Sequence, residues 1–116
     1  MENDCIFCKI IQHQAPAEIV YQDGEVTAFE NIRHIAPVHL LIVPNRHITS
    51  VDHTRPGDEA LLGRLVTLAA QLARDRGISL SGYRLVINTG PDGGQSVFHL
   101  HLHLIGGRKL HFEFSR

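Results

Sequence analysis

The chain has 116 residues, of which 43% are hydrophobic and 20% are charged, and its formal net charge is -1. This is the composition of an ordinary globular protein, so we expect a single domain, residues 1–116, with its own packed core. The near-zero net charge offers no basic surface for nucleic acid or anionic lipid. No apolar stretch reaches the roughly 20 residues of a membrane-spanning helix. We therefore expect neither a nucleic-acid nor a membrane partner.

The N-terminal segment MENDCIFCKI is acidic at its start and has neither a basic region nor a long apolar core. We therefore expect no signal peptide, and a cytoplasmic location. In that compartment Cys5 and Cys8 are expected to be reduced thiols or metal ligands and not a disulfide. A short helix is predicted here from the helical spacing of four apolar residues, and Ala15-Pro16 closes it. These residues are Ile6, Phe7, Ile10 and Ile11.

Three short strands are predicted next along the chain. Glu18–Tyr21 and Glu25–Phe29 are β-type runs around Asp23-Gly24, a pair that favours a tight hairpin turn. The continuous apolar run His39–Val43 predicts a buried strand, which Pro44 ends.

A long helix and two further strands complete the chain. Leu61, Leu65, Leu68 and Leu72 draw an apolar stripe at helical spacing. Capping groups in 54–58 precede this helix, and Gly77 follows it as a left-handed C-cap. Strands are predicted at Arg84–Asn88 and Val97–Ile105, across the glycine-rich turn TGPDGGQ. The order of elements predicts an α+β fold: an antiparallel five-stranded sheet with one short N-terminal helix and one long helix.

Residues 98–105, FHLHLHLI, place His99, His101 and His103 at alternate positions. In a strand the three imidazoles would share one face, and the intervening leucines would pack on the core from the other. We expect the histidine face to line a wet or partly wet site. Imidazole can serve as nucleophile, acid or base near neutral pH, and two such rings can hold a metal. A third reading is the polar face of a strand.

Two further clusters have residue types that suit binding. Glycines in NTGPDGGQS, residues 88–96, allow backbone N–H groups to converge on an anion, and Gln95 and Ser96 add donors. By itself this segment is more typical of a turn between strands, but directly ahead of the histidine stripe we interpret it as a phosphate-binding loop. A cysteine pair such as Cys5 and Cys8 is typical of buried packing. If the fold brings His47 and His99 close to it, the four side chains could form a zinc site. His39 opens an apolar strand and can join the cluster of triad histidines. We expect the remaining histidines at the surface: His13, His34, His53 and His111.

The segments IFCKII, APVHLLIVPNRHI and GGQSVFHLHLHLIGG, in that order, resemble the Hint branch of the HIT (histidine triad) superfamily. The family motif is His-x-His-x-His followed by two apolar residues, and the resemblance covers nearly the whole chain. It implies a HIT-like fold and a homodimer in which two sheets join. The IGG after the triad is more typical of Hint than of Fhit-like hydrolases. A third histidine, where the nucleotidylyltransferase branch has glutamine, favours hydrolysis over transfer.

The resemblance implies a hydrolase that cleaves the P–N bond of purine nucleoside 5′-phosphoramidates and releases AMP or GMP. His101 would be the nucleophile and form a covalent nucleotidyl-histidine, with no metal required. His103 and Ser96 would contact the phosphate and the leaving amine. His99 would orient the nucleophile, and His39 would lie behind the triad. The phosphate oxygens would be held by Asn88, Gln95 and the backbone near Val97.

A nucleoside pocket and a structural zinc are also implied. The pocket residues would be Ile6, Phe7, Ile10, Phe29 and Ile32. Asn31 stands where the family commonly has an aspartate that accepts hydrogen bonds from the ribose. Because an amide oxygen lacks the charge, we expect weaker nucleotide binding or an altered sugar preference, with catalysis intact. Zinc would be held by Cys5, Cys8, His47 and His99 and would tie the N-terminal helix to the sheet. The tail RKLHFEFSR lacks the tryptophan of some relatives, so the leaving-group preference stays open.

Three alternatives remain open at this point. The chain could hydrolyse dinucleoside polyphosphates or other nucleotidyl compounds, as other members of the superfamily do. It could be a zinc-dependent hydrolase with the triad as metal ligands, because spacing alone does not exclude this. It could also be a zinc-containing nucleotide-binding or interaction module without strong catalysis. The presence of all three histidines together with Ser96 and Asn88 favours an enzyme.

Overall fold

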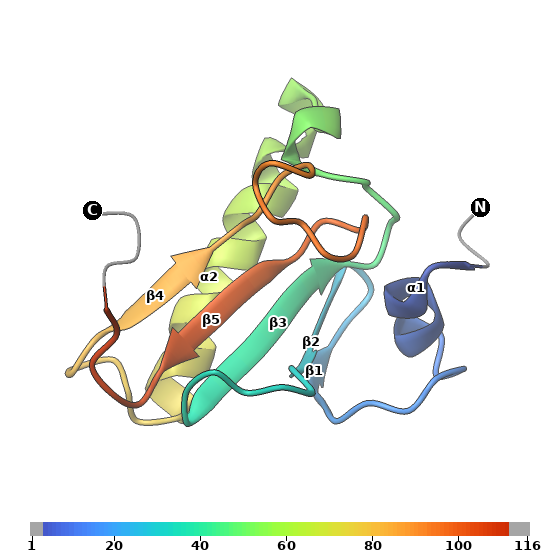
Figure 1. Cartoon of the computed structure of the whole chain (residues 1–116). Helices are drawn as coiled ribbons and strands as arrows, with labels where there is room; N and C mark the ends of the chain where they lie inside the picture. Colours follow the sequence, from blue (N-terminus) through green and yellow to red (C-terminus); the bar gives the residue numbers. More distant parts are fainter. Residues whose placement is uncertain (1–3, 112–116) are drawn as a thin grey trace.

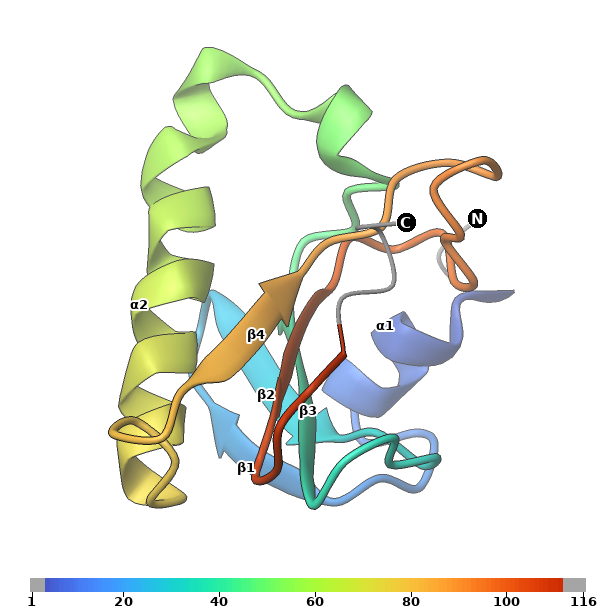
Figure 2. The same ribbon diagram turned by 60° about the vertical axis from the view of Figure 1, so that its left-hand side comes forward.

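The computed structural model describes residues 4–111, which form an α+β fold, as predicted (Figure 1). Five antiparallel strands make one sheet in the order β1-β2-β3-β5-β4. The long helix α2 covers one face of this sheet and the short helix α1 lies against the other (Figures 1 and 2). In chain order the elements are α1 (Ile6–Ile11), β1 (Ile19–Gln22), β2 (Val26–Glu30), β3 (Val38–Pro44), α2 (Glu59–Asp75), β4 (Tyr83–Val86) and β5 (Leu102–Gly106).

The long helix ends where its sequence predicts. Gly77 adopts a φ of 72°, the left-handed conformation expected of a helix C-cap glycine. Its N–H donates to the Arg74 carbonyl, and the N–H of Ile78 donates to the Ala73 carbonyl, which together form a Schellman motif. The helix begins after a single 3-10 turn, Pro56–Asp58. Within residues 4–111, no helix combines the length and the apolar character needed to cross a membrane.

The alternation of side chains across the sheet creates two separate cores. Leu40 and Ile42 of β3, with Leu102 and Leu104 of β5, pack against the apolar stripe of α2. The opposite face of β3 contributes Leu41 and Val43 to a smaller cluster, whose other buried members are Phe7, Ile10 and Phe29. This second cluster holds α1 on the face of the sheet that carries the histidines.

The predicted strand Val97–Ile105 is wrong in its first half, because β5 begins only at Leu102. Two carbonyls that could pair in a ladder accept imidazole N–H groups instead. The Pro44 carbonyl, at the end of β3, accepts from Nε2 of His99 at 2.8 Å, and the His99 carbonyl accepts from Nδ1 of His101 at 2.8 Å. The N–H of Leu100 donates to the Ile48 carbonyl, beyond β3. The chain therefore leaves the regular ladder at the point where the histidines are placed.

Candidate active site

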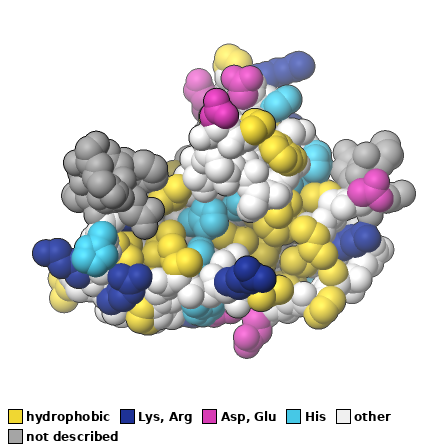
Figure 3. Space-filling view, viewed as in Figure 1, with side chains coloured by type: hydrophobic (Ala, Val, Ile, Leu, Met, Phe, Trp, Pro, Cys, Tyr) yellow, Lys and Arg dark blue, Asp and Glu magenta, His cyan; other side chains and the backbone are white. Residues whose placement is uncertain are grey.

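The three triad histidines lie on the α1 side of the sheet, opposite the buried leucines, as the alternation predicts. The expectation of a wet face is wrong for two of them, since His99 is 0% and His101 is 3% exposed. Their cover is Phe7 of α1, whose ring meets those of His99 and His101 edge-on at centroid distances of 5.9 and 5.1 Å. His103 is half-buried. Figure 3 shows histidine side chains in the middle of this face, with hydrophobic side chains next to them.

The hydrogen bond of His101 defines which of its ring nitrogens can react. Nδ1 donates to the His99 carbonyl, so the neutral ring carries its proton on Nδ1 and a lone pair on Nε2. Burial lowers the pKa of His101 below the usual 6.5, against the opposing effect of the His99 carbonyl. The side chain is therefore a neutral imidazole near neutral pH, the form that a nucleophile requires.

The pH dependence of the free enzyme should reflect this shift. We expect kcat/KM on a nucleoside phosphoramidate to be level near neutral pH and to decline on the acid side only below 6.5, because burial lowers the pKa of His101. The sign follows from the need for a deprotonated nucleophile: the rate falls as pH falls through the pKa, and a lowered pKa moves that fall to lower pH. A steady-state pH profile measures it, and an acid limb centred above 6.5 would contradict the assignment.

His39 and His103 are joined across the sheet. Leu41 of β3 is the direct partner of His103, and His39 lies two residues earlier on the same face. Nε2 of His39 and Nδ1 of His103 are 2.9 Å apart. Burial is the main cause that lowers the pKa of both rings, and the neighbouring imidazoles lower it further. The pKa of His103 is lowered to about 4. His103 in turn lies 5.0 Å from His101 between ring centroids, so the two rings face one site.

The glycine-rich loop is built by its own backbone contacts. Asn88 donates through Nδ2 to the Gly93 carbonyl at 2.8 Å. A Cβ on Gly93 would lie 2.2 Å from the Thr89 carbonyl oxygen, so only glycine fits there. Gln95 is 6% exposed, and both N–H donors of its amide are used: Nε2 donates to the carbonyls of Thr49 and Val97 at 2.8 and 3.0 Å. As placed, Gln95 shapes the loop and offers no side-chain donor to a phosphate, whereas Ser96 is exposed.

We expect Gln95→Ala to lower the free energy of unfolding by about 1–3 kcal/mol, because the partly buried carbonyls of Thr49 and Val97 lose their donor. The N–H of Gly90 would also lose its acceptor, the Gln95 Oε1 atom 2.9 Å away. Urea denaturation measures the change, and kcat/KM should fall with it as the loop loosens. Gln14→Ala, at an exposed glutamine, is the matched control. A loss no larger than that of the control would refute this supporting role.

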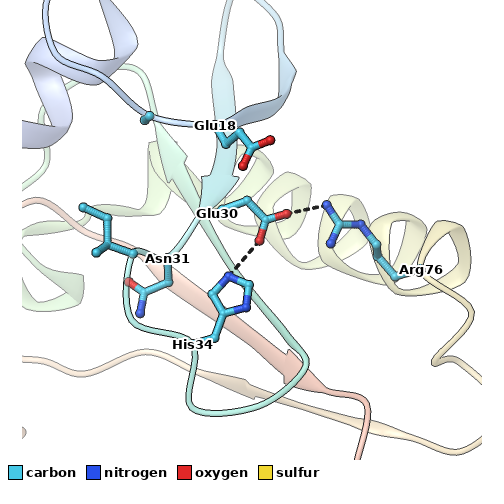
Figure 4. A pocket seen from close by; sticks show the side chains of 7 residues that line it. Glu18, Glu30, Asn31, His34 and Arg76 are labelled. Atoms are coloured by element: carbon cyan, nitrogen blue, oxygen red, sulfur yellow. Dashed lines mark hydrogen bonds and ion pairs between the residues drawn. The ribbon is translucent and has the colours of Figure 1, made fainter.

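The predicted nucleoside pocket is only partly assembled. Phe7, Ile10 and Phe29 are buried together, and the two phenyl rings pack edge-on at 5.3 Å. Ile6 and Ile32 are exposed, Ile32 almost completely at 94%. A pocket on the rim of the sheet instead groups Asn31 and Ile32 with residues outside the triad: Ala17, Glu18, Glu30, His34 and Arg76. In Figure 4, ion pairs join Glu30 to Arg76 and to His34, and Asn31 stands apart from this chain of charges.

The four predicted metal ligands come together, from α1, the segment after β3 and the segment before β5. One ligand atom from each of Cys5, Cys8, His47 and His99 lies within 4.8 Å of all the others. The Nδ1 atom of His99 is 3.4 and 3.5 Å from the two sulfurs, and that of His47 is 3.4 Å from Cys8 Sγ. Tetrahedral zinc, with bonds of ~2.3 Å to sulfur and ~2.0–2.1 Å to nitrogen, requires S···N edges of about 3.6 Å. The donor set and its spacing therefore fit zinc.

The second nitrogen of His99 supports this fit. Nε2 donates to the Pro44 carbonyl at 2.8 Å, so the lone pair of the neutral ring is on Nδ1, which faces the sulfurs. Burial lowers the pKa of His99 to about 4, which keeps the ring neutral. The Pro44 carbonyl and the Thr49 carbonyl that binds Gln95 were not identified from the sequence. No sequence signal marks them, because any residue supplies a carbonyl and only the fold brings it close.

The fold and the histidine cluster together define a member of a known family. The HIT domain family matches residues 12–110, most of the chain, and the chain therefore belongs to the HIT domain family. Among its relatives is the purine nucleoside phosphoramidase of Escherichia coli (strain K12), 49% identical over 110 residues, which are 95% of this chain and 92% of that protein.

Solved structures agree with this membership. A HIT family hydrolase from Legionella pneumophila is similar with a TM-score of 0.93 and 44% identity, over 95% of this chain and 98% of that one. A zinc-bound histidine triad family protein from Mycobacterium smegmatis is similar with a TM-score of 0.80 and 31% identity, over 93% of this chain and 78% of that one. The predicted family and fold are thus confirmed.

Proposed function

We propose that this protein hydrolyses the P–N bond of purine nucleoside 5′-phosphoramidates through a covalent nucleotidyl-histidine on His101. The observation that carries the proposal is the hydrogen bond from Nδ1 of His101 to the His99 carbonyl, which leaves Nε2 as a neutral nucleophile. The 49% identity to a purine nucleoside phosphoramidase supports the substrate class.

In the first half of the reaction, Nε2 of His101 forms a bond to phosphorus and the P–N bond to the amine breaks. The departing nitrogen keeps the electron pair of that bond and takes a proton from solvent, while the neutral His103 contacts the leaving group. In the second half a water oxygen bonds to phosphorus, the bond to His101 breaks, and the proton of the water passes to solvent. The products are the free amine and the nucleoside monophosphate, and splitting the reaction in this way replaces one slow displacement by two faster ones.

Backbone and side-chain donors are proposed to hold the phosphate. Asn88, Ser96 and the N–H of Val97 lie on the loop that enters the histidine cluster, and Gln95 fixes the shape of that loop. Donors that are already oriented stabilise the charge that develops on phosphorus in the transition state. Phe7, Ile10 and Phe29 would form the apolar floor beneath the base, with Ile6 and Ile32 at its rim, and Asn31 would accept from the ribose through Oδ1.

We also propose that Cys5, Cys8, His47 and His99 bind a structural zinc ion. Bound there, zinc would tie α1 to the segment before β5 and so hold the His99 carbonyl that orients His101. The alternative of a catalytic zinc on the triad has less support, because the His99 ring nitrogens point to the cysteines and to Pro44 and not to a point shared with the other two histidines. The homodimer and the cytoplasmic location remain predictions.

The direct test is incubation with a panel of adenosine 5′-phosphoramidates, followed by rapid quenching and intact-mass measurement. We expect release of AMP and a protein species heavier by one adenylyl group. The assay repeated on a chelated, still-folded protein separates the two roles of zinc: activity should persist if zinc is structural and disappear if it is catalytic. Hydrolysis of dinucleoside polyphosphates in preference to phosphoramidates would favour the other superfamily activity.

A further inference from the structure

The two cysteines of the candidate metal site form a Cys-x-x-Cys pair at the N-terminus of α1, and one of them can be reached from solvent. We propose that Cys5 and Cys8 are a reversible oxidation site, at which a small disulfide such as glutathione disulfide converts the two thiols into an intramolecular disulfide. The new bond moves the first turn of α1 and with it Phe7, the cover of the nucleophile His101. This modification goes beyond the proposed hydrolysis, and only its effect on turnover rests on that function.

The two sulfurs are already close to each other. Cys5 is the N-cap of α1, and its Sγ accepts the backbone N–H of Cys8 at 3.3 Å. Both sulfurs lie against one atom, Nδ1 of His99, at 3.4 and 3.5 Å, and they are within 4.8 Å of each other. Because a disulfide requires ~2 Å between its sulfurs, a local movement of the first turn of the helix is enough to form the bond.

The two cysteines differ in their access to solvent. Cys5 is partly exposed and lines a surface cavity of about 410 Å³, together with Ile6, His47 and Phe98. Cys8 is only 6% exposed. A disulfide in solution therefore meets the sulfur of Cys5 first, and Cys8 lies behind it as the second thiol that closes the bond.

The oxidation proceeds by thiol–disulfide exchange in two steps. In the first, the thiolate of Cys5 bonds to one sulfur of the external disulfide, whose S–S bond breaks and releases one small thiolate. In the second, the thiolate of Cys8 bonds to Sγ of Cys5, the mixed disulfide breaks, and the other small thiolate leaves. The two protein thiols are oxidised, the external disulfide is reduced to two thiols, and the two protons pass through solvent to the released thiolates.

The bond affects the triad through Phe7, which lies between the two cysteines in the sequence. The Phe7 ring is 6% exposed and packs edge-on against the rings of His99 and His101. Because the turn that carries this ring must move when the sulfurs approach, oxidation disturbs the cover of the nucleophile. A sulfur in a disulfide is also no longer a thiolate, so oxidation removes two of the four candidate zinc ligands. We therefore expect the oxidised protein to release its zinc and to turn over more slowly.

The test incubates the wild type as purified, Cys5→Ser and Cys8→Ser with glutathione disulfide, and follows each by intact mass and with a chromogenic zinc indicator. We expect the wild type to lose the mass of two hydrogens, to carry no glutathione and to release its zinc, and dithiothreitol should restore both thiols. Cys8→Ser lacks the second thiol and should therefore hold one glutathione on Cys5. Cys5→Ser should react far more slowly, because its remaining thiol is buried.

Turnover is compared between the oxidised wild type and a reduced wild type from which metal has been removed by chelation, so that the two forms differ only in the disulfide. We expect kcat/KM on an adenosine 5′-phosphoramidate to be about 10-fold lower in the oxidised form, the scale of effect when a supporting contact of a site is lost, and to recover with dithiothreitol. Equal turnover of the two forms, or a wild type that forms no internal disulfide, would overturn the proposal. If the reduced wild type cleaves no phosphoramidate, the proposed function fails, and the masses of the three proteins then decide the oxidation site by themselves.

Discussion

Replacing His101 with glycine is expected to lower kcat/KM on adenosine 5′-phosphoramidates by about 10⁴-fold or more, the scale of loss when a nucleophile is removed from a catalytic unit. The reason is that Nε2 of His101 is the atom placed to attack phosphorus, since Nδ1 is held by the His99 carbonyl. His103 lies 5.0 Å away between ring centroids, and its Nδ1 is 2.9 Å from Nε2 of His39.

The measurement pairs steady-state kinetics with intact mass. The adenylyl adduct seen with the wild type should be absent from His101→Gly, and circular dichroism should show that the variant keeps its fold. His53→Gln is a matched control at an exposed histidine, whose Nδ1 lies 2.8 Å from Oγ of Ser50. It should keep both activity and adduct. Turnover by His101→Gly at the wild-type rate would refute the mechanism.

Replacing Cys8 with serine is expected to abolish zinc binding and lower the melting temperature by roughly 10–20 °C relative to the zinc-loaded protein. A metal that binds only the native state stabilises it by ~4 kcal/mol at a free concentration about 1,000 times its dissociation constant. For a domain of this size, each kcal/mol corresponds to roughly 4 °C. The two sulfurs and two imidazole nitrogens that lie within 4.8 Å of one another are the structural basis of the expectation.

Elemental analysis and thermal melts with and without a chelator test this prediction. The wild type and the His53→Gln control should each hold one zinc per chain and lose stability on chelation, whereas Cys8→Ser should be insensitive to the chelator. A wild type that binds no zinc, or that melts at the same temperature after chelation, would contradict the assignment. Residual turnover by chelated wild type would be consistent with a zinc that supports His99 and takes no part in chemistry.

Much of the architecture follows from local patterns in the sequence. The leucine stripe at helical spacing defines α2, and Gly77 defines its end. Asp23-Gly24 forms the turn that connects β1 to β2. These features can be predicted because helix periodicity and turn conformation depend on residues that are close in sequence. The alternation of histidine and leucine from His99 to Leu104 assigns the two faces correctly even where the regular strand is absent. Leu100, Leu102 and Leu104 lie in the core against α2, whereas His99 and His101 lie beneath Phe7 on the other face.

The sequence by itself thus determined the family, the α+β order of elements, the face that carries the triad and the four residues that come together as a candidate metal site. The tertiary structure decided which nitrogen of His99 and of His101 carries the proton, and that both rings are buried beneath Phe7. It also decided that Gln95 supports the loop. The physical reason is that a tautomer depends on the acceptor or donor next to the ring. Here those partners are backbone groups, the carbonyls of Pro44 and His99, which the fold brings to the rings of His99 and His101.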